Sequence, residues 1–226
     1  YLYFEADDGT NGYELWRTNG TTTTLVSDIW AGEDGSYPNS FAVLGGYLYF
    51  TAYESADGWE VWRTNGTTTT LVSDVNVGAN SSNPAGFTAL RGYLYFSAAG
   101  STQGTELWRT DGSATTLVSD IEAGADSSFP QGFTALGGYL YFSAYDDTHG
   151  FELWRTDGTT TTLVSDIRVG GDSYPQGFTA LGGSLYFQAN DGTHGTELWR
   201  IGDGLPATDR NQSTDLPSLL LLSSLL

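Results

Sequence analysis

The sequence contains no cysteine, no methionine and no lysine in its 226 residues. Without cysteine, the fold cannot depend on disulfide bonds, and neither a thiolate metal site nor a cysteine nucleophile is available. The absence of methionine even at position 1 leads us to expect a processed or trimmed chain, from which any signal peptide is already missing.

Positive charge is scarce. Eight basic residues, all arginine, stand against 27 acidic residues, so the formal net charge is −19. Such a surface repels phosphate and anionic lipid, and we therefore expect no nucleic-acid partner. No apolar run is long enough to span a membrane directly. Two explanations of the charge stay open: solubility in a salty or extracellular setting, and cation binding by acidic loops.

A block of about 46 residues recurs along the chain. Tyr-Leu-Tyr-Phe starts at Tyr1, Tyr47, Tyr93 and Tyr139 and returns as Ser-Leu-Tyr-Phe at Ser184, while Glu-Leu-Trp-Arg or Glu-Val-Trp-Arg keeps step with it. A fixed period of this size marks a repeat architecture in which each unit needs its neighbours to bury its apolar faces. We divide the chain into the repeats 1–46, 47–92, 93–138, 139–183 and 184–226, the last being degenerate.

Each repeat has four strand-like segments. In the second repeat they are 47–52, 59–64, 69–75 and 87–90, and the first alternates with a period of two, apolar on both faces. Asn-Gly or Asp-Gly (as at Asn65-Gly66) and Gly-Gly (as at Gly45-Gly46) predict tight turns between segments. A linear β-solenoid is the competing architecture. The short connections and four-stranded repeats favour an all-β fold, a single five-bladed β-propeller domain over 1–226.

Several motifs resemble the bacterial ELWxxDGT repeat family. Glu-Leu-Trp-Arg-Thr-Asp-Gly at 106–112 and at 152–158, Leu-Val-x-Asp-Ile at 163–167 and Phe-Thr-x-Leu-Gly-Gly at 178–183 carry this resemblance over roughly residues 1–204. The link Gly20-Thr-Thr-Thr-Thr24 is shorter than in the family, which leaves the register of the third strand open. The resemblance implies a secreted or surface-associated bacterial protein and no settled activity.

The ends of the chain suggest how a ring could close. If the Phe-Thr-Ala-Leu segment is the innermost strand of each blade, the first blade lacks one. We predict that Leu219 to Leu222 supplies it and that the two chain ends pair, which removes a free sheet edge. A tail without this role is the alternative.

Two longer loops per repeat should gather at one end of the sheets, where binding residues are expected. Aromatic side chains near carboxylates and amides there suggest a sugar-binding surface, although packing between blades would explain the same rings. The candidate ligand-binding residues are Tyr37, Tyr53, Trp59, Phe129, Tyr145 and Tyr174.

The loop before each proline repeats an acidic or amide pair six residues apart, and glycines and serines recur there with the same spacing. Oxygen-rich loops of this kind suit Ca²⁺, which takes 6–8 oxygen ligands. Turn capping by the first Asp is the alternative. The candidate metal ligands are Asp28, Asp34, Asp74, Asn80, Asp120, Asp126, Asp166 and Asp172.

Two other sets of residues suggest structural roles. His149 and His194 lie at equivalent positions and are expected to be loop spacers rather than a joint metal site. The arginine after each Trp (Arg17, Arg63, Arg109, Arg155, Arg200) is expected to pair with carboxylates or carbonyls.

Catalysis has little support in the sequence, since no Gly-x-Ser-x-Gly elbow and no phosphate-binding loop are present. We therefore expect a non-enzymatic, extracellular or cell-surface protein that binds a glycan or a surface protein, with calcium as a candidate cofactor. The alternative is a structural subunit of a larger surface or filamentous assembly, and an oligomer is compatible with both. A third hypothesis is a hydrolase that uses paired Asp residues in the central channel.

Overall fold

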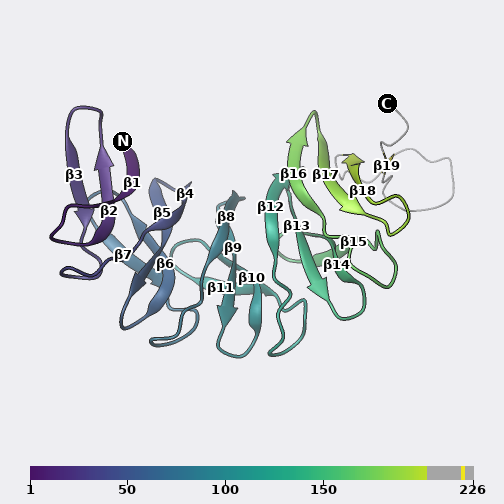
Figure 1. Cartoon of the computed structure of the whole chain (residues 1–226), viewed down its shortest axis with the longest axis horizontal. Helices are drawn as coiled ribbons and strands as arrows, with labels where there is room; N and C mark the ends of the chain where they lie inside the picture. The colour runs from purple at the N-terminus through teal and green to yellow at the C-terminus, as the bar shows by residue number, and fades with distance from the viewer. Residues whose placement is uncertain (203–219, 222–226) are drawn as a thin grey trace. The chain divides into compact units, whose positions relative to one another are not determined.

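The computed structural model describes residues 1–202 and 220–221 of the chain (Figure 1). In this part all the strands belong to five antiparallel sheets, and none of the described residues is helical. No helix of the described chain could therefore cross a membrane. The chain divides into two compact units, residues 1–117 with 124–126, and 118–123 with the described part of 127–226.

The first unit contains three sheets. Their strands, in spatial order, are β1 (Leu2–Asp7), β2 (Tyr13–Thr18) and β3 (Thr23–Ser27); β4 (Asn39–Leu44), β5 (Tyr47–Glu54), β6 (Gly58–Thr64) and β7 (Thr69–Ser73); β8 (Ala85–Leu90), β9 (Tyr93–Gly100), β10 (Gly104–Thr110) and β11 (Thr115–Ser119), the last two residues of which belong to the second unit.

The second unit contains two sheets. Their strands, again in spatial order, are β12 (Gln131–Leu136), β13 (Tyr139–Asp146), β14 (Gly150–Thr156) and β15 (Thr161–Ser165); β16 (Gln176–Leu181), β17 (Ser184–Asn190), β18 (Thr196–Gly202) and β19 (Leu220–Leu221). All the neighbours in these orders are sequential, so each sheet is a meander.

Each four-stranded sheet is out of phase with the sequence repeat. Its first strand is the Phe-Ala-Val-Leu or Phe-Thr-Ala-Leu segment from the end of the preceding repeat, as the sequence suggested. A Gly-Gly turn, or Arg91-Gly92 in the third sheet, joins it to the second strand. Gly45 and Gly46 take φ angles of +59° and +82° there, which L side chains adopt only with strain. First strands of successive sheets contact each other, β4 with β8 and β12 with β16.

The tail pairs with a different sheet from the one we predicted. Leu220 and Leu221 pair with Arg200 and Trp199 of β18, so they extend the fifth sheet, and the first sheet has three strands. The reason is local: the last Trp-Arg strand has no Leu-Val-Ser strand after it, and its open edge accepts the nearest apolar segment. Leu219 and Leu222 lie outside the described residues.

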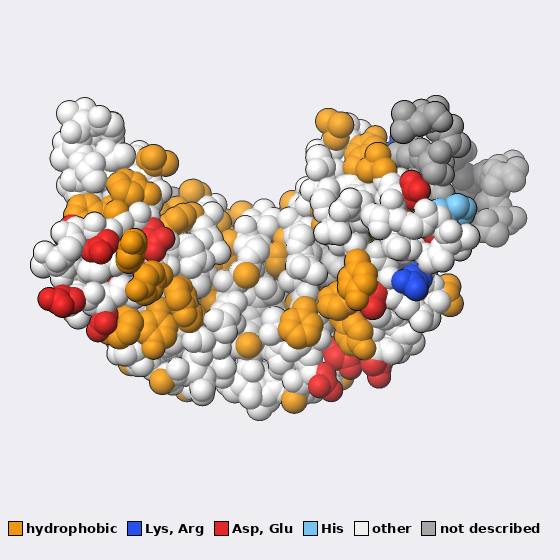
Figure 2. All heavy atoms as spheres, viewed as in Figure 1, with side chains coloured by type: hydrophobic (Ala, Val, Ile, Leu, Met, Phe, Trp, Pro, Cys, Tyr) orange, Lys and Arg blue, Asp and Glu red, His pale blue; other side chains and the backbone are white. Residues whose placement is uncertain are grey.

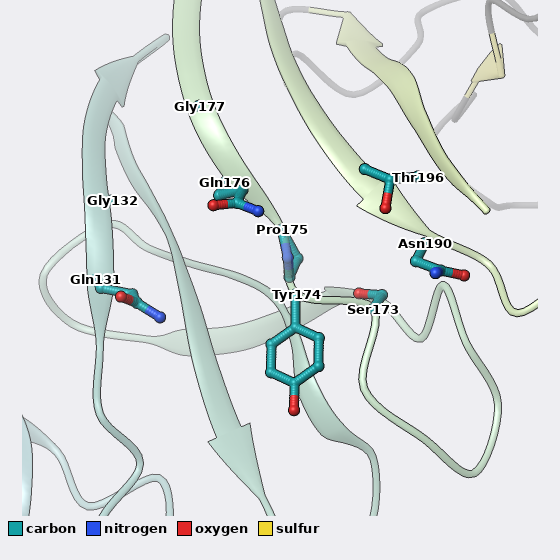
Figure 3. Close-up of a pocket in the computed structure, with 9 residues that line it drawn as sticks. All are labelled: Gln131, Gly132, Ser173, Tyr174, Pro175, Gln176, Gly177, Asn190 and Thr196. Atoms are coloured by element: carbon teal, nitrogen blue, oxygen red, sulfur yellow. The ribbon is translucent and has the colours of Figure 1, made fainter.

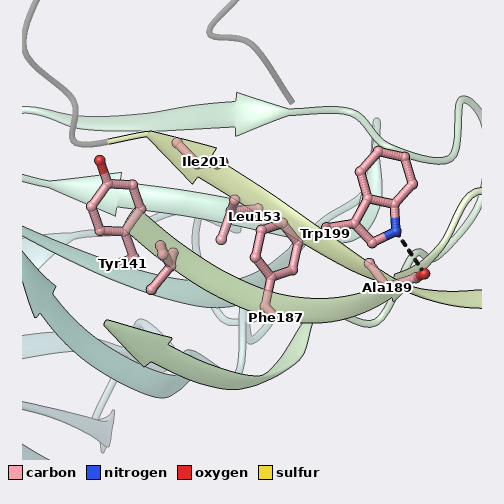
Figure 4. Packing of buried hydrophobic residues seen from close by; sticks show 7 residues of the cluster. Tyr141, Leu153, Phe187, Ala189, Trp199 and Ile201 are labelled. Carbon is pink, nitrogen blue, oxygen red and sulfur yellow. Dashed lines mark hydrogen bonds between the residues drawn. The ribbon is translucent and has the colours of Figure 1, made fainter. Parts of the chain in front are cut away.

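Both faces of the second strand in a sheet are buried, as the two-residue alternation predicts. Tyr49 and Phe50 point to opposite faces and are 1% and 0% exposed. In the second unit one cluster joins Tyr141 and Leu153 of the fourth sheet to Leu185, Phe187 and Ile201 of the fifth (Figure 4). Packing between adjacent sheets therefore forms the core.

The last strand of the sheet, which is the third segment of the sequence repeat, carries a bulge that sets its register. Val61 pairs with Ser73 and the next residue, Trp62, pairs with Leu71, which leaves Val72 as the extra residue. The same shift occurs between β2 and β3 and between β14 and β15.

The Asn-Gly connections are longer than the tight turns we expected. Four residues separate β2 from β3, and only the glycine, Gly20 at φ +89°, has a positive φ. The Oδ1 of Asn19 instead accepts hydrogen bonds from the N–H groups of Thr21 and Thr22, at 2.9 and 2.8 Å. The asparagine thus acts as a turn acceptor, a role that Asp shares.

Candidate functional site

The residue before the proline of each of the first four repeats has an unusual backbone conformation. Tyr37, Asn83, Phe129 and Tyr174 have φ angles between +46° and +49°, a left-handed conformation that is costly for residues other than glycine. The N–H of Tyr37 donates to the Tyr13 carbonyl at 3.0 Å, and Tyr174 donates to Phe151 in the same way. The strain directs three aromatic side chains outward, each 44–54% exposed.

In the first unit these loops form an aromatic cluster, which we define as Tyr13, Trp30, Tyr37, Tyr53 and Trp59. Tyr13 and Tyr37 are stacked, with ring centroids 5.5 Å apart. Trp59 lies 6.4 Å from Tyr37 and 5.7 Å from Tyr53, and Trp30 lies 4.8 Å from Tyr53. Figure 2 shows hydrophobic side chains gathered over this region of the first unit, with acidic side chains around them.

A buried glutamate holds the loop that leads to the pre-proline residue, as Glu14 and Glu60 show. The carboxylate of Glu14 is 0% exposed and accepts the N–H groups of Ile29, Trp30 and Ser36 and the hydroxyl of Ser36 at 2.5–3.2 Å. Glu60 holds Val75 and Ser82 in the same way. Burial raises the pKa of both carboxyls, that of Glu60 to about 7.

The second unit has a smaller aromatic cluster, made of Tyr145, Phe151 and Tyr174. Phe151 stacks on Tyr174 with centroids 5.4 Å apart and lies 5.4 Å from Tyr145. The Tyr174 hydroxyl donates to Oδ2 of Asp172 at 3.0 Å, which raises the pKa of the tyrosine. The other oxygen of Asp172 accepts the Phe151 N–H at 2.8 Å, so this carboxylate fixes the stacked pair.

The structure brings together most of the aromatic residues that the sequence singled out. Tyr37, Tyr53 and Trp59 share one cluster, and Tyr145 and Tyr174 share the other, while Phe129 is 54% exposed on its own loop. Sequence reasoning missed Tyr13, Trp30 and Phe151. The position of Tyr13 and Phe151 directly before Glu-Leu-Trp, which Trp59 also occupies, was the signal that could have revealed two of them.

The candidate metal ligands do not form a compact group. Asp28, Asp34, Asp120, Asp126 and Asn80 are exposed, and Asp74, Asp166 and Asp172 are half-buried. Asp74 Oδ2 accepts the N–H of Gly78 at 2.8 Å, which is the turn-capping role. Within residues 1–202 and 220–221, no three acidic, histidine or cysteine side chains are arranged to hold a metal. Calcium binding remains a prediction.

The histidines and arginines make local contacts. His149 Nδ1 lies 2.8 Å from Asp146 Oδ2, and His194 Nδ1 lies 2.7 Å from Asp191 Oδ2; these bonds raise the pKa of both histidines. Four of the repeated arginines lie over the face of the first tyrosine of their own repeat, with Arg109 4.3 Å from the Tyr93 centroid and the other three, Arg17, Arg63 and Arg155, at 4.5 Å. Tyrosine rings, and not the carboxylates or carbonyls that we expected, are thus the partners shown for these four arginines, and Arg63 also donates to the Tyr49 hydroxyl at 3.5 Å.

No protein-family model matches the sequence, and no curated protein matches it either. Solved structures do. A GH74 xyloglucanase from Xanthomonas campestris is 18% identical with a TM-score of 0.52, over 89% of this chain and 34% of its own. A prolyl endopeptidase is 12% identical with a TM-score of 0.57, over 89% and 31%. This chain spans about a third of the length of both.

The β-propeller domain of the Trilobed protease from Pyrococcus furiosus is 12% identical with a TM-score of 0.52, over 89% of this chain and 62% of that one. These similarities correct one expectation. We predicted that the protein is not an enzyme, and this prediction was wrong. The same architecture occurs in chains of a xyloglucanase, a puromycin hydrolase and a prolyl endopeptidase, so it does not argue against catalysis. The chain therefore has the all-β, propeller-like fold of antiparallel sheets.

Proposed function

We propose that the protein binds neutral glycans through the loop end that carries the exposed aromatic rings. The observation that supports this most is the aromatic cluster of the first unit, where Tyr13 and Tyr37 are 46% and 44% exposed although they are stacked on each other. Rings fixed at the surface present flat apolar faces at small entropic cost, which suits the C–H faces of sugar rings.

Backbone strain supports the same interpretation. A left-handed φ at Tyr37, Phe129 and Tyr174 costs free energy that burial of these rings does not return, since each stays about half exposed. Strain of this kind is concentrated at binding sites. Acidic side chains near the rings would accept hydrogen bonds from sugar hydroxyls, and the strongly negative charge disfavours acidic sugars. We include calcium assistance and an extracellular or cell-surface location in the proposal.

The test is a glycan array, read with calcium and with a chelator. The decisive variant is Tyr37→Asn, because Asn83 occupies the same left-handed, pre-proline position in the next repeat. This substitution keeps the backbone and removes the ring. We expect the variant to melt like the wild type and to lose at least tenfold in affinity for the glycans that the wild type binds. A wild type that binds no glycan would refute the proposal.

We also propose that the five sheets are the blades of one closed ring, as the contacts between first strands within each unit suggest. Small-angle scattering of the monomer distinguishes a ring from an open arrangement.

A structural subunit of a larger assembly is a second candidate function. The first sheet has three described strands, and Tyr1 and Leu2 at its β1 edge are 74% and 67% exposed. An unpaired edge can accept a strand of another chain. Concentration-dependent assembly in size-exclusion chromatography would support this function, and a monomer at all concentrations would contradict it.

A further inference from the structure

The second unit contains a cavity of about 350 Å³ beside the start of the fifth sheet (Figure 3). Gln131 contributes from β12, and Tyr174, Gln176, Asn190 and Thr196 contribute from the loop before β16 and from β16, β17 and β18. Its volume lies at the lower end of the range of roughly 300–1,000 Å³ that is typical of small-molecule sites. All its lining residues belong to the same compact unit.

The cavity marks a departure from the repeat. Asn190 and Thr196 are directly opposite each other on β17 and β18. At the same paired positions the fourth sheet has Tyr145 and Phe151, and the second sheet has Tyr53 and Trp59. Both of those pairs are aromatic and in ring contact. Two polar side chains thus replace two rings, and the space that the rings would occupy is open.

Only the fifth sheet combines such an open pair with an aromatic wall among the described repeats. The third sheet also has small residues there, Ala99 and Thr105, but its pre-proline residue is Asn83. In the fifth sheet that residue is Tyr174, whose ring is held by stacking on Phe151 and by the hydroxyl bond to Asp172. One wall of the cavity is therefore a fixed aromatic face.

The rest of the lining combines the polar side chains of Gln131, Ser173, Gln176, Asn190 and Thr196 with Pro175 and two glycines, and none of these residues carries a formal charge. Within the described chain, the side chains of Gln131, Gln176 and Thr196 make no hydrogen bond, and Asn190 uses Oδ1 to accept the N–H of Gly192 at 2.7 Å. Carboxamides can donate and accept at neighbouring atoms, which matches adjacent hydroxyl groups on a sugar ring. An ionic ligand would find no opposite charge in this lining.

We propose that this cavity binds a single neutral sugar residue of hexose size, with its C–H face on Tyr174 and its hydroxyls on the amides of Gln131, Gln176 and Asn190. This inference rests on the proposed glycan binding and adds to it a defined site and a ligand class. It also gives a role in ligand recognition to the replacement of two aromatic residues by Asn190 and Thr196 in the fifth repeat.

The test fills the cavity with the aromatic pair that the fourth sheet carries at the same positions. The double variant N190Y/T196F installs the pair that the fourth sheet carries, and A99Y/T105F makes the same change in the third sheet as a matched control. Binding of glucose, galactose, mannose, N-acetylglucosamine and their disaccharides is measured by calorimetry and by saturation-transfer NMR. We expect N190Y/T196F to lose at least tenfold in affinity and the control to bind like the wild type.

The outcomes separate the two proposals. If N190Y/T196F binds the sugars as well as the wild type, or if the wild type binds none of them, the cavity is not the site. In both cases the proposed function would still be supported if the wild type binds glycans on the array and Tyr37→Asn abolishes that binding. If N190Y/T196F fails to fold, Gln176→Ala provides the same comparison, because this side chain is exposed and makes no hydrogen bond to the described residues.

Discussion

Glu60 shows how a single buried carboxylate can make stability depend on pH. Its partners are backbone N–H groups and the hydroxyl of Ser82, and burial raises its pKa from 4.5 to about 7. Folding therefore favours the protonated form. The contribution to stability is complete below the unfolded pKa and is lost as pH rises through the folded one. The raised pKa values of Glu14 and Glu152 act in the same direction.

We predict that the protein is more stable at pH 5 than at pH 8, and that Glu60→Gln reduces this difference. The amide cannot ionise, so the pH-dependent loss of unfolding free energy should shrink by about 2 kcal/mol. Urea unfolding at several pH values measures it. Glu33→Gln, on an exposed loop, is the matched control. The same pH dependence of the unfolding free energy in Glu60→Gln as in the wild type would contradict the prediction.

Ser40 is strained where its counterparts are not. It takes φ +57° at the bulge of β4, where three other sheets have Gly86, Gly132 and Gly177 at +68° to +74°. A left-handed L residue costs about 1–2 kcal/mol, part of which glycine gives back through its freedom in the unfolded chain.

We therefore expect Ser40→Gly to raise the unfolding free energy by about 0.5–1 kcal/mol. The reciprocal change Gly177→Ser should lower it, because a Cβ there meets no atom within 4 Å and only the backbone strain counts. Chemical denaturation measures both. No gain in Ser40→Gly would show that neighbouring contacts, rather than φ, decide stability at this bulge.

At the scale of the element, the turns that follow the Trp-Arg strands, such as β2–β3 and β10–β11, differ in what they pack against. Gly20 and Gly112 have nearly equal φ angles, +89° and +90°. A Cβ at Gly20 meets nothing within 4 Å, whereas a Cβ at Gly112 would collide with Arg63 Nη1 and Tyr49 Oη of the neighbouring sheet. Tyr49 is 1% exposed and has no room to move.

Alanine at these two glycines should separate backbone strain from packing between sheets. Both Gly20→Ala and Gly112→Ala pay the strain of a positive φ, but only Gly112→Ala also overpacks, which typically costs about 1–3 kcal/mol. We expect Gly112→Ala to melt at a clearly lower temperature than Gly20→Ala. Equal melting temperatures would mean that the neighbouring sheet does not press on this turn.

Local periodicity made most of the strands predictable. The alternation over 47–52 and the Gly45-Gly46 turn before it located this strand from the residues alone, and the structure extends the strand to Glu54. The bulge at Val72 and the left-handed φ of Tyr37 were not predicted, because each is imposed by partners on another strand. The pairing of Leu220–Leu221 with β18 was also missed, since an apolar pair does not reveal which free edge it will join.

The candidate site was predictable in composition and not in arrangement. Exposed rings such as Tyr37 and Trp59 could be chosen from their loops, but the stacking with Tyr13 depends on a hydrogen bond between distant backbone atoms. The cavity beside Tyr174 arises from what Asn190 and Thr196 lack compared with their counterparts. Such an absence becomes visible only when paired positions on two strands are compared.

At the scale of the whole molecule, the offset between sequence repeat and sheet decides which segment could be exchanged as a unit. Splitting the chain at residue 46 would remove β4 from its own sheet. The stretch 39–84 instead carries β4 to β7 together with Glu60 and the outgoing loop that Glu60 holds through Val75 and Ser82. A gene duplication or a designed graft that lengthens this protein would therefore need its boundaries just after a proline, and not at Tyr-Leu-Tyr-Phe.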